Sequence, residues 1–576
     1  MSSVAAAYAK LPDVVRDMLD DVDTDGTFKV VEALTALGEK LSGSRAEHDA
    51  LGLITAKLRQ WGVDFKVHRF EALISHPVST ELVAPFGMID TGGSGFTAST
   101  PEGGLEAGIV VCPGNAIDRL DADQVQGRIV LAEGVPNFGF AFAAQKLGAA
   151  AVLFASTGVQ CHKTELSPLW GSPTSREQLD QLLAIPVVSI PSGGGRKLLE
   201  MQPDETVRLT CEVDTSWREI ALPVAEIKGR DSRFLLAGAH YCTWYGGATD
   251  NASGAAILLE MARVLSKHRG KLEYGIRFAW WPGHEQGEYA GSSWYADHHW
   301  MELHELGLGY HNLDIVGVRG GVLKATRNQT GDMADYTRDV VAAFTEPMSE
   351  KDAAFVAKAL RREDKYVPAD RVARNSDQSF CGIGLSSYQV SSFQAADSPD
   401  HLTNSGIAWW WQSAYDTVDR CDPIELEQDI RINLALSAGL VTSYALPMNP
   451  AGLARDLCAS IREYQEAAPD LPMLTELGER ASELLQKIET AQSLPASDAR
   501  QRNDTLLRIS RHLTPVLYHP DSRFQYGIGR RNRTLPGLMP ALSLSSASGE
   551  DARFMRLHII RAANRIALAI ARAGRL

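Results

Sequence analysis

The sequence predicts an α/β protein with a mostly parallel or mixed sheet and helices on both of its faces. Three observations lead to this prediction. Between Ala221 and Pro447, short apolar runs alternate with segments of helical periodicity, which is the pattern of a sheet covered by helices. Between Gly104 and Val213 the apolar runs are short and bounded by glycine and proline, which predicts a β-rich insert. After Pro447 the periodicity is helical, which predicts a C-terminal helical domain.

The opening segment predicts two helices followed by a strand. Gly62 ends the second helix, and the next run, VDFKVHRFEA (63–72), alternates apolar and polar residues as a half-buried strand does. Two helices and a strand in this order open an α/β domain. The residues at helical spacing are Val30, Leu34, Leu37 and Leu41 in the first helix and Leu51, Ile54, Leu58 and Trp61 in the second.

The insert interrupts this pattern. The runs GIVVCPG, GRIVLAEG, AAVLFAS and IPVVSIP read as short strands, with a small helix at 141–148. The expected division is therefore an α/β domain of residues 1–103 and 214–447, an insert of residues 104–213 and a helical domain of residues 448–576. The order of a GRIVL strand, AFAAQKLGAAAVLFAS and IPVVSI resembles the protease-associated domain.

The α/β pattern resumes with three buried strands that each lead to a polar residue. RFLLAGAHY ends near His240, YGIRFAWWPG leads to Glu285, and LGYHNLDIVG contains Asp314. A loop and helix, GATDNASGAAILLEMARVLSKH, separate the first two strands. Ligands of such sheets bind outside the carboxyl ends of the strands, so these three side chains are expected to converge.

Composition and charge exclude several kinds of partner. The formal net charge of −14 over 576 residues argues against nucleic acid and anionic membrane surfaces. No run of about 18 apolar residues occurs, so no transmembrane helix is expected, and the first residues predict an amphipathic helix rather than a signal peptide. The 7 cysteines are scattered singly, which argues against a disulfide framework and a thiolate zinc site. The expected location is the cytoplasm.

One histidine and three carboxylates form a candidate metal site. Divalent ions such as zinc bind imidazole nitrogen and carboxylate oxygen, and a catalytic site keeps one position open for water. The candidates are His240, Asp250, Glu285 and Asp314. The set favours zinc and also suits manganese.

These residues occur in the order of a known family. A histidine after a strand, an aspartate in GATDNASG, a glutamate after FAWW and an aspartate in NLDIVG resemble the M28 family of zinc aminopeptidases and carboxypeptidases. The resemblance covers roughly the whole chain and implies the zinc-exopeptidase type of fold. It implies two zinc ions bridged by Asp250, one also bound by His240 and Glu285, the other by Asp314 and a late histidine. A homodimer is also implied only by this resemblance.

Four positions depart from the family pattern. Where the family has two consecutive glutamates, this chain has His284-Glu285, so His284 takes the place of the general base. The family's HxD reads His240-Tyr241-Cys242, and its SDH reads Ser376-Asp377-Gln378. Gln412, four residues before Asp416, stands where the family has its late histidine.

Two alternatives remain open at these positions. If the GS that follows anchors the alignment, Glu285 becomes the base and Gln286 the ligand; the matches of FAWW and EQG favour the first alignment. Gln412 is a weak neutral ligand, which favours one metal ion over two. Gln412 is then a relic of the lost ligand or a substrate contact, and His401, in SPDHLTNSG, is a candidate replacement ligand.

The expected function is metal-dependent hydrolysis of an amide bond. His284 would take a proton from the attacking water and pass it to the leaving amine, because the ordinary pKa of histidine lies near neutral pH. The altered site favours a small-molecule or short peptide-like substrate. Two alternatives stay open. One is a non-catalytic scaffold, since the transferrin receptor resembles its peptidase relatives. The other is a mononuclear lyase or cyclase, since glutaminyl cyclases resemble this family and have a single zinc ion.

Overall fold

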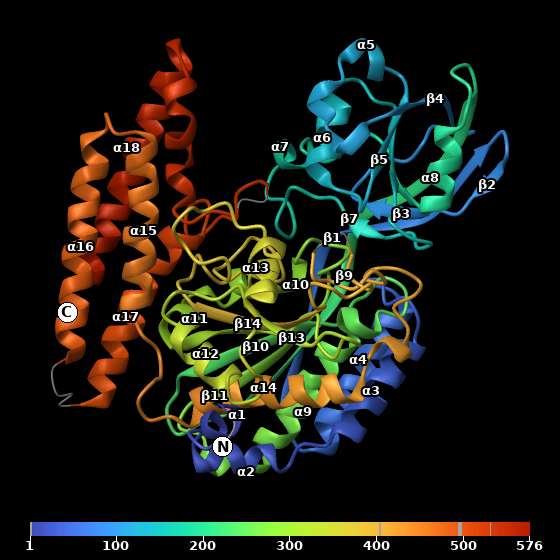
Figure 1. Ribbon diagram of the computed structural model, residues 1–576. Coiled ribbons are helices and arrows are strands. Elements are labelled where there is room, and N and C mark those ends of the chain that lie inside the picture. Colours follow the sequence, from blue (N-terminus) through green and yellow to red (C-terminus); the bar gives the residue numbers. More distant parts are fainter. Residues whose placement is uncertain (1–2, 403–404, 494–497, 530–531, 576) are drawn as a thin grey trace.

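The computed structural model describes residues 3–402, 405–493, 498–529 and 532–575. Figure 1 shows a helix-covered sheet at the base, a small β-rich body above it and a bundle of long helices along one side. Among the described residues, no helix is long and apolar enough to cross a membrane. The elements confirm the predicted α/β class, with a mixed sheet, covering helices and a helical C-terminal part.

The centre of the fold is a mixed sheet in the order β13-β14-β12-β10-β11-β9. β10 pairs in parallel with β11 and β12, and β12 pairs in parallel with β14. β13 and β9 are antiparallel to their neighbours, and β1 pairs with β9 along almost its whole length. The bounds are β1 Asp64–Ala84, β9 Thr206–Ile227, β10 Phe234–His240, β11 Gly275–Trp281, β12 Gly307–Asn312, β13 Leu323–Arg327 and β14 Ser386–Phe393.

Helices bury both faces of this sheet. In β10, Leu235 and Ala237 join the core formed with α3, α9 and α14, whereas Phe234 and Leu236 join the core formed with α10 and α11. Alternate side chains of a strand point to opposite faces, so both faces are closed to water. The helices are α1 Ser3–Tyr8, α2 Asp13–Leu19, α3 Thr24–Ala36, α4 Arg45–Gln60, α9 Ser253–Lys267, α10 Ala290–His298, α11 Trp300–Leu306, α12 Ala334–Val341, α13 Glu350–Ala359 and α14 Pro423–Thr442.

The β-rich insert has its own strands and its own apolar cores. Its strands run in the order β4-β5-β6-β8-β3-β7, and β4 joins the central sheet through β9. β3 belongs to this body although it precedes residue 104, because it pairs with β8 and β7, and Ile89 of β2 joins one of the insert's apolar cores. Its elements are β2 Gly87–Ile89, β3 Gly92–Gly95, β4 Leu105–Val111, α5 Ala122–Val125, β5 Ile129–Glu133, α6 Phe138–Lys146, β6 Ala151–Ala155, β7 Thr164–Glu165, α7 Arg176–Leu179, β8 Val187–Ile190 and α8 Ser192–Leu199.

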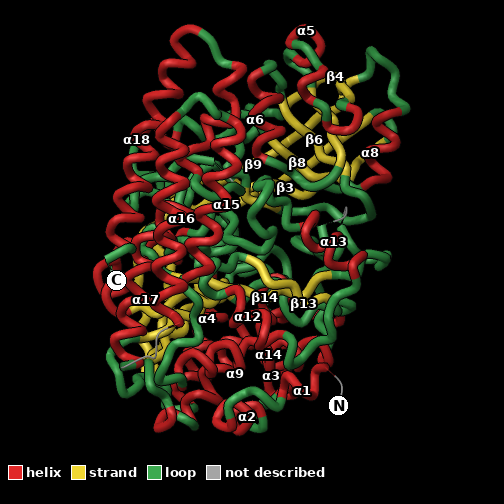
Figure 2. The backbone as a smooth tube through the Cα atoms, turned by 60° about the vertical axis from the view of Figure 1, so that its left-hand side comes forward, coloured by secondary structure: helices red, strands yellow, loops and turns green. Residues whose placement is uncertain are grey.

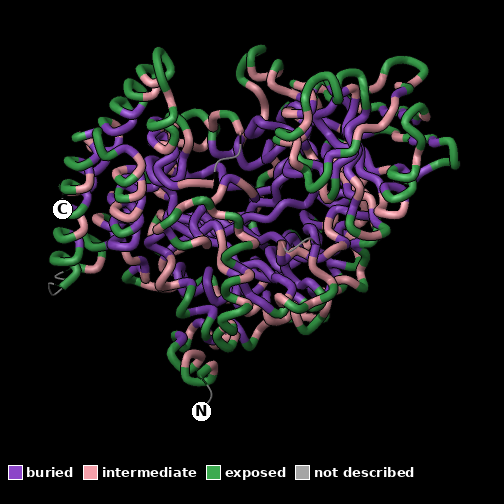
Figure 3. The backbone as a smooth tube through the Cα atoms, turned by 45° about the horizontal axis from the view of Figure 1, so that its top comes forward, coloured by how far each residue is buried: buried purple, intermediate pink, exposed green. Residues whose placement is uncertain are grey.

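The C-terminal part is a bundle of long helices around a separate apolar core. Figure 2 shows these helices side by side, and Figure 3 shows that their outer turns are exposed while the backbone in the middle of the molecule is mostly buried. The bundle packs an apolar stripe of each helix inward. Its helices are α15 Ala451–Ala467, α16 Pro472–Ser493, α17 Ala499–Tyr518 and α18 Gly549–Ala573, with the 3-10 segment Pro536–Ser546 between the last two.

The start of α4 contains a buried carboxyl group that makes stability depend on pH. Ser44 caps the helix by accepting from the Glu47 amide, and a Glu47 carboxyl oxygen accepts from the Gly43 amide. Burial raises the pKa of Glu47 to about 8, against the opposing effect of these hydrogen bonds. Because this pKa is raised on folding, the neutral form stabilises the native state below about pH 4.5, and that contribution is lost as the pH rises toward 8.

We expect Glu47→Gln to remove this pH dependence. Between pH 5 and pH 8.5, the free energy of unfolding of the variant should fall by about 2–4 kcal/mol less than that of the wild type, since one pKa unit corresponds to about 1.4 kcal/mol. Denaturant unfolding at the two pH values measures the difference. Glu32→Gln, at an exposed position of α3, is the control. An unchanged pH dependence in Glu47→Gln would show that this carboxyl is not responsible.

Candidate metal centre

The predicted site residues meet at the carboxyl edge of the central sheet. His240 is the last residue of β10, and Asp314 follows the end of β12 by two residues. His284 and Glu285 follow β11, and Asp250 lies in the turn Ala248–Ala252 that leads into α9. All five side chains are buried. The convergence follows from the parallel pairing of β10, β11 and β12, which brings their carboxyl ends to one edge.

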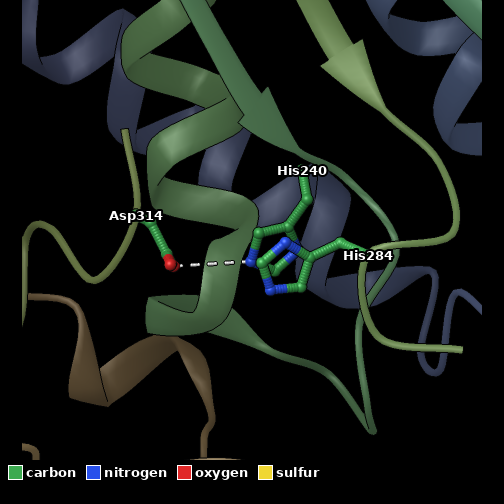
Figure 4. Close-up of side chains that lie close together, drawn as sticks. All are labelled: His240, His284 and Asp314. Carbon is green, nitrogen blue, oxygen red and sulfur yellow. Dashed lines mark ion pairs between the residues drawn. The ribbon is translucent and has the colours of Figure 1, made fainter. Parts of the chain in front are cut away.

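His240 stands at the centre of the site. Its Nε2 lies 3.1 Å from Asp250 Oδ1 and 3.4 Å from Asp314 Oδ1, and the contact with Asp314 is drawn in Figure 4. His240, Asp250 and Glu285 form one group whose potential ligand atoms all lie within 4.8 Å of one another. His240, His284 and Asp314 form a second such group. Any ion bound in either group therefore involves His240.

Neighbouring groups fix the orientation of these side chains. His240 Nδ1 donates to the carbonyl oxygen of Cys242 over 2.9 Å, which leaves Nε2 facing the carboxylates. A ligand histidine in a metal site is held in the same way. The Asp250 turn is held by Asp416, whose carboxylate accepts from the backbone amides of Thr249 and Asp250.

The charges of the site are strongly coupled. Burial would lower the pKa of His240, but the carboxylates of Asp250 and Asp314 outweigh it and hold that pKa well above its usual range. Burial would raise the pKa of Asp314, but His240 and the Ser376 hydroxyl lower it below its usual range. The pKa of Glu285 is well above its usual range because the group is buried and faces the charge of Asp250.

The residues present fit a divalent cation. His240 Nε2, Glu285 Oε1 and Asp314 Oδ1 are buried and have no hydrogen-bond partner among the described residues. Buried polar atoms are normally satisfied, so three such atoms at one point suggest a missing ligand. One imidazole nitrogen and carboxylate oxygens are the donors that zinc binds at catalytic sites.

Gln412 lies at the site but next to Glu285 rather than Asp314. Its Nε2 donates to Glu285 Oε2 over 2.8 Å, and its backbone carbonyl accepts from the amide of Lys163 in the insert. The expected first set, His240, Asp250 and Glu285, is one of the two groups of potential ligands, whereas the Gln412 side chain, expected beside Asp314, contacts Glu285. Asp314 lies against His240, and the Gln412 side offers only Glu285 and a neutral amide.

His284 lies flat against His240. The two ring centroids are 3.7 Å apart and the ring planes differ by 12° (Figure 4). His284 Nδ1 donates to Asp377 Oδ2 over 2.6 Å. The sequence noted Asp377 only as a part of a family motif; its contact with His284 could not be inferred, because more than ninety residues separate them along the chain.

Two candidates from the sequence lie outside the cluster. Gln286 Oε1 accepts from the backbone amide and hydroxyl of Ser42, so the alternative alignment, with Gln286 as ligand, does not match the geometry. The ring of His401 packs 5.7 Å from that of Phe355 on α13. His401 belongs to neither group of potential ligands among the described residues.

A cavity of about 780 Å³ opens onto the site between the α/β domain and the insert. Asp250, His284 and Asp314 line its floor. The insert contributes polar and aromatic residues, and a strand-end arginine, which the sequence did not single out, comes from β13. That arginine is Arg327.

Residues 224–434 match the sequence profile of Peptidase family M28. The probable glutamate carboxypeptidase VP8 of Zea mays is 26% identical over 410 residues, covering 59% of this chain and 57% of the relative. Aminopeptidase YwaD of Bacillus subtilis is 30% identical over 294 residues, covering 49% of this chain and 59% of the relative. The chain thus spans between half and two thirds of the length of these relatives.

Two solved structures share the fold. BSAP, a zinc aminopeptidase from Bacillus subtilis, has a TM-score of 0.54 and 21% identity, covering 72% of this chain and 94% of that one. A Peptidase M28 precursor from Shewanella amazonensis has a TM-score of 0.57 and 20% identity, covering 75% and 96%. At these identities the comparison establishes the fold, in agreement with the zinc-exopeptidase type that the sequence predicted.

Proposed function

We propose, from the premise that residues 224–434 form an M28 peptidase domain, that this protein hydrolyses amide bonds with one divalent metal ion, zinc by preference. The observation that carries the proposal is the convergence of His240, Asp250, Glu285 and Asp314 with three buried ligand atoms unsatisfied. A structural role gives no reason for burying an imidazole among three carboxylates, since such a cluster costs desolvation and repulsion.

The ion would be held by His240, Asp250 and Glu285, and Asp314, whose Oδ1 lies 3.4 Å from His240 Nε2, would add a further carboxylate oxygen. A divalent ion bound here polarises an amide carbonyl and lowers the pKa of a coordinated water. Gln412 supports a single ion, because a neutral amide binds zinc weakly where a histidine would complete a second site. The protein contributes burial, which excludes bulk water from the charged groups.

His284 supplies the proton transfer. Its Nδ1 is bound to Asp377, so the lone pair of the neutral ring is on Nε2, where it accepts a proton from the attacking water. The water oxygen bonds to the amide carbon, the C–N bond breaks, and His284 returns the proton to the leaving nitrogen. The products are a carboxylic acid and an amine.

Arg327 supports a substrate that carries an anionic group. It is the last residue of β13 and lines the cavity with His284 and Asp314. Among the described residues its side chain has no hydrogen bond or ion pair, whereas that of Arg371 pairs with Asp370 and Asp456. A free guanidinium beside the reacting groups suits a carboxylate, in keeping with the name of the Zea mays relative, a probable glutamate carboxypeptidase.

We expect Arg327→Ala to discriminate between substrates. For an N-acyl amino acid, the variant should lower kcat/KM about 10–100-fold, the usual worth of a charge-assisted hydrogen bond. For the corresponding amino-acid amide, which lacks the carboxylate, kcat/KM should change less than about 3-fold. Steady-state assays of both substrates, with circular dichroism as the folding control, make the comparison. An equal loss on both would remove Arg327 from substrate recognition.

The reaction itself is tested in H₂¹⁸O. The zinc-loaded protein is incubated with a panel of N-acyl amino acids, aminoacyl amides and dipeptides, and the products are analysed by mass spectrometry. Hydrolysis places one ¹⁸O in the acid product. Cyclisation or elimination gives products without solvent oxygen and would favour a lyase or cyclase. A metal-loaded protein that converts no member of the panel would favour the binding scaffold.

A further inference from the structure

Two adjacent residues in the loop between α13 and β14 form hydrogen bonds with Asp314 and His284 of the site. Ser376 and Asp377 both have left-handed backbones, with φ of 54° and 57°. Ser376 donates its hydroxyl to Asp314, and Asp377 accepts from His284. We propose that this turn is the positioning element of the centre: Ser376 orients the Asp314 carboxylate toward the metal, and Asp377 fixes the tautomer and direction of His284. The inference rests on the proposed function but concerns residues outside the ligand set.

The Ser376 half is supported by a chain of buried hydrogen bonds with one direction. Trp281 Nε1 donates to the Tyr310 hydroxyl over 3.0 Å, and Tyr310 donates to Asn312 Oδ1 over 2.6 Å. Asn312 Nδ2 then donates to Ser376 Oγ over 2.8 Å, and Ser376 donates to Asp314 Oδ2. An indole N–H can only donate, so the Tyr310 hydroxyl accepts from it and donates to Asn312. The Asn312 amide then donates to the Ser376 oxygen, and the Ser376 hydroxyl hydrogen points to Asp314.

This chain has a consequence for the second oxygen of Asp314. With Oδ2 occupied by Ser376, Oδ1 is left facing His240 Nε2 at 3.4 Å, and it has no hydrogen bond among the described residues. The Ser376 hydroxyl thus fixes one oxygen of the carboxylate and leaves the other available in a fixed direction. Outer partners orient metal ligands in this way. Loss of Ser376 should therefore weaken metal binding.

The Asp377 half acts on His284. Asp377 is almost fully buried and its Oδ2 lies 2.6 Å from His284 Nδ1. An ionised carboxylate only accepts, so the hydrogen of the neutral ring sits on Nδ1 and the lone pair on Nε2. The His240 ring at 3.7 Å on one face and the Tyr289 ring at 4.9 Å limit rotation of the imidazole. Loss of the Asp377 charge should allow the His284 ring to adopt the other tautomer, with its hydrogen on Nε2, without removing a metal ligand.

Adjacent single variants separate the two roles. Asp377→Asn keeps a residue that tolerates the left-handed conformation, and Ser376→Ala removes only the hydroxyl. Long-range ¹H–¹⁵N NMR of the metal-free, histidine-labelled protein reports the tautomer of His284, whose signal is assigned by its absence in His284→Gln. Zinc affinity is measured by competition with a chromogenic chelator, and kcat and KM are measured on the zinc-loaded protein.

The expected results form a crossed pattern. In the wild type, we expect His284 to be the Nδ1–H tautomer. In Asp377→Asn, the Nε2–H tautomer appears and kcat falls about 10–100-fold, the usual effect of losing an outer partner. KM and zinc affinity of this variant change less than about 3-fold. Ser376→Ala keeps the tautomer and loses about 10–100-fold in zinc affinity.

The pattern can fail in distinguishable ways. An unchanged tautomer and kcat in Asp377→Asn, or equal effects of both variants on tautomer and zinc affinity, would overturn the positioning role. If the wild type hydrolyses no amide, the proposed function fails, but the tautomer and zinc measurements still decide whether this turn positions Asp314 and His284.

Discussion

Replacing His240 with alanine is expected to abolish both metal binding and hydrolysis. His240 belongs to both groups of potential ligands, and it is the positive partner of Asp250 and Asp314. Without it, Asp250 and Glu285 keep no nitrogen ligand in their group. We expect zinc affinity to fall by more than about 10³-fold and turnover to fall to background, because a catalytic zinc site rests on three protein ligands.

The matched control for this prediction is His401→Ala. His401 was a candidate replacement ligand, but its ring lies against Phe355 rather than in the site. The control should keep the wild-type zinc content and activity. Zinc content by elemental mass spectrometry and hydrolysis rates are measured on both variants after identical purification. Full metal content and activity in His240→Ala would refute the site, and loss of metal in His401→Ala would identify it as a ligand.

Replacing His284 with alanine is expected to remove catalysis while leaving the metal in place. General base catalysis by a positioned side chain contributes about 10²–10⁴-fold, so kcat should fall by this factor with little change in KM. Asp377, a carboxylate outside the ligand set, holds His284 through Nδ1 and leaves Nε2 for proton transfer. Rapid kinetics and zinc content on the same preparation test this.

The comparison with His240→Ala separates a base from a ligand. His284 has a ligand atom within reach of His240 and Asp314, so a direct role in metal binding is the competing assignment. A base leaves zinc content unchanged in His284→Ala and lowers only turnover. If zinc affinity falls as far as in His240→Ala, His284 is a ligand and the proton must pass through another group.

Much of the fold followed from local patterns. The strands around 234–240, 275–281 and 307–312 and the long helix at 423–442 lie where apolar runs and helical spacing predicted them. Gly62 ends the second predicted helix region and has φ of 62°, a conformation that glycine adopts without strain. These elements were readable because the sheet is buried on both faces, which makes its strands apolar throughout.

The residue at which the insert begins could not be predicted from local sequence patterns. β3 is a run of glycine and serine, Gly92–Gly95, with no apolar pattern, yet it pairs with β8 and β7. Its backbone hydrogen bonds, rather than its side chains, place it in the insert. β1 likewise continues to Ala84, beyond the predicted end at residue 72, because β9 offers partners along the whole length.

The ligand cluster could be predicted, but its internal contacts could not. Strand ends brought His240, Asp314 and Glu285 together as expected, since parallel strands align their carboxyl edges. Which side Gln412 occupies, and that Asp377 holds His284, depend on loops whose paths are set by tertiary packing. Arg327 was missed because an arginine at a strand end has no distinctive sequence signal. The homodimer expected from the resemblance stays a prediction.

The central claim is tested most directly by counting metal ions per chain. Protein purified without chelators or a histidine tag, saturated with zinc and freed of excess, is analysed by elemental mass spectrometry, with Gln412→His as the comparison. One ion in the wild type and two in Gln412→His are the expected results, because a histidine at position 412, beside Glu285, would supply the nitrogen ligand that a neutral amide does not. Two ions in the wild type, or none after saturation, would contradict the account.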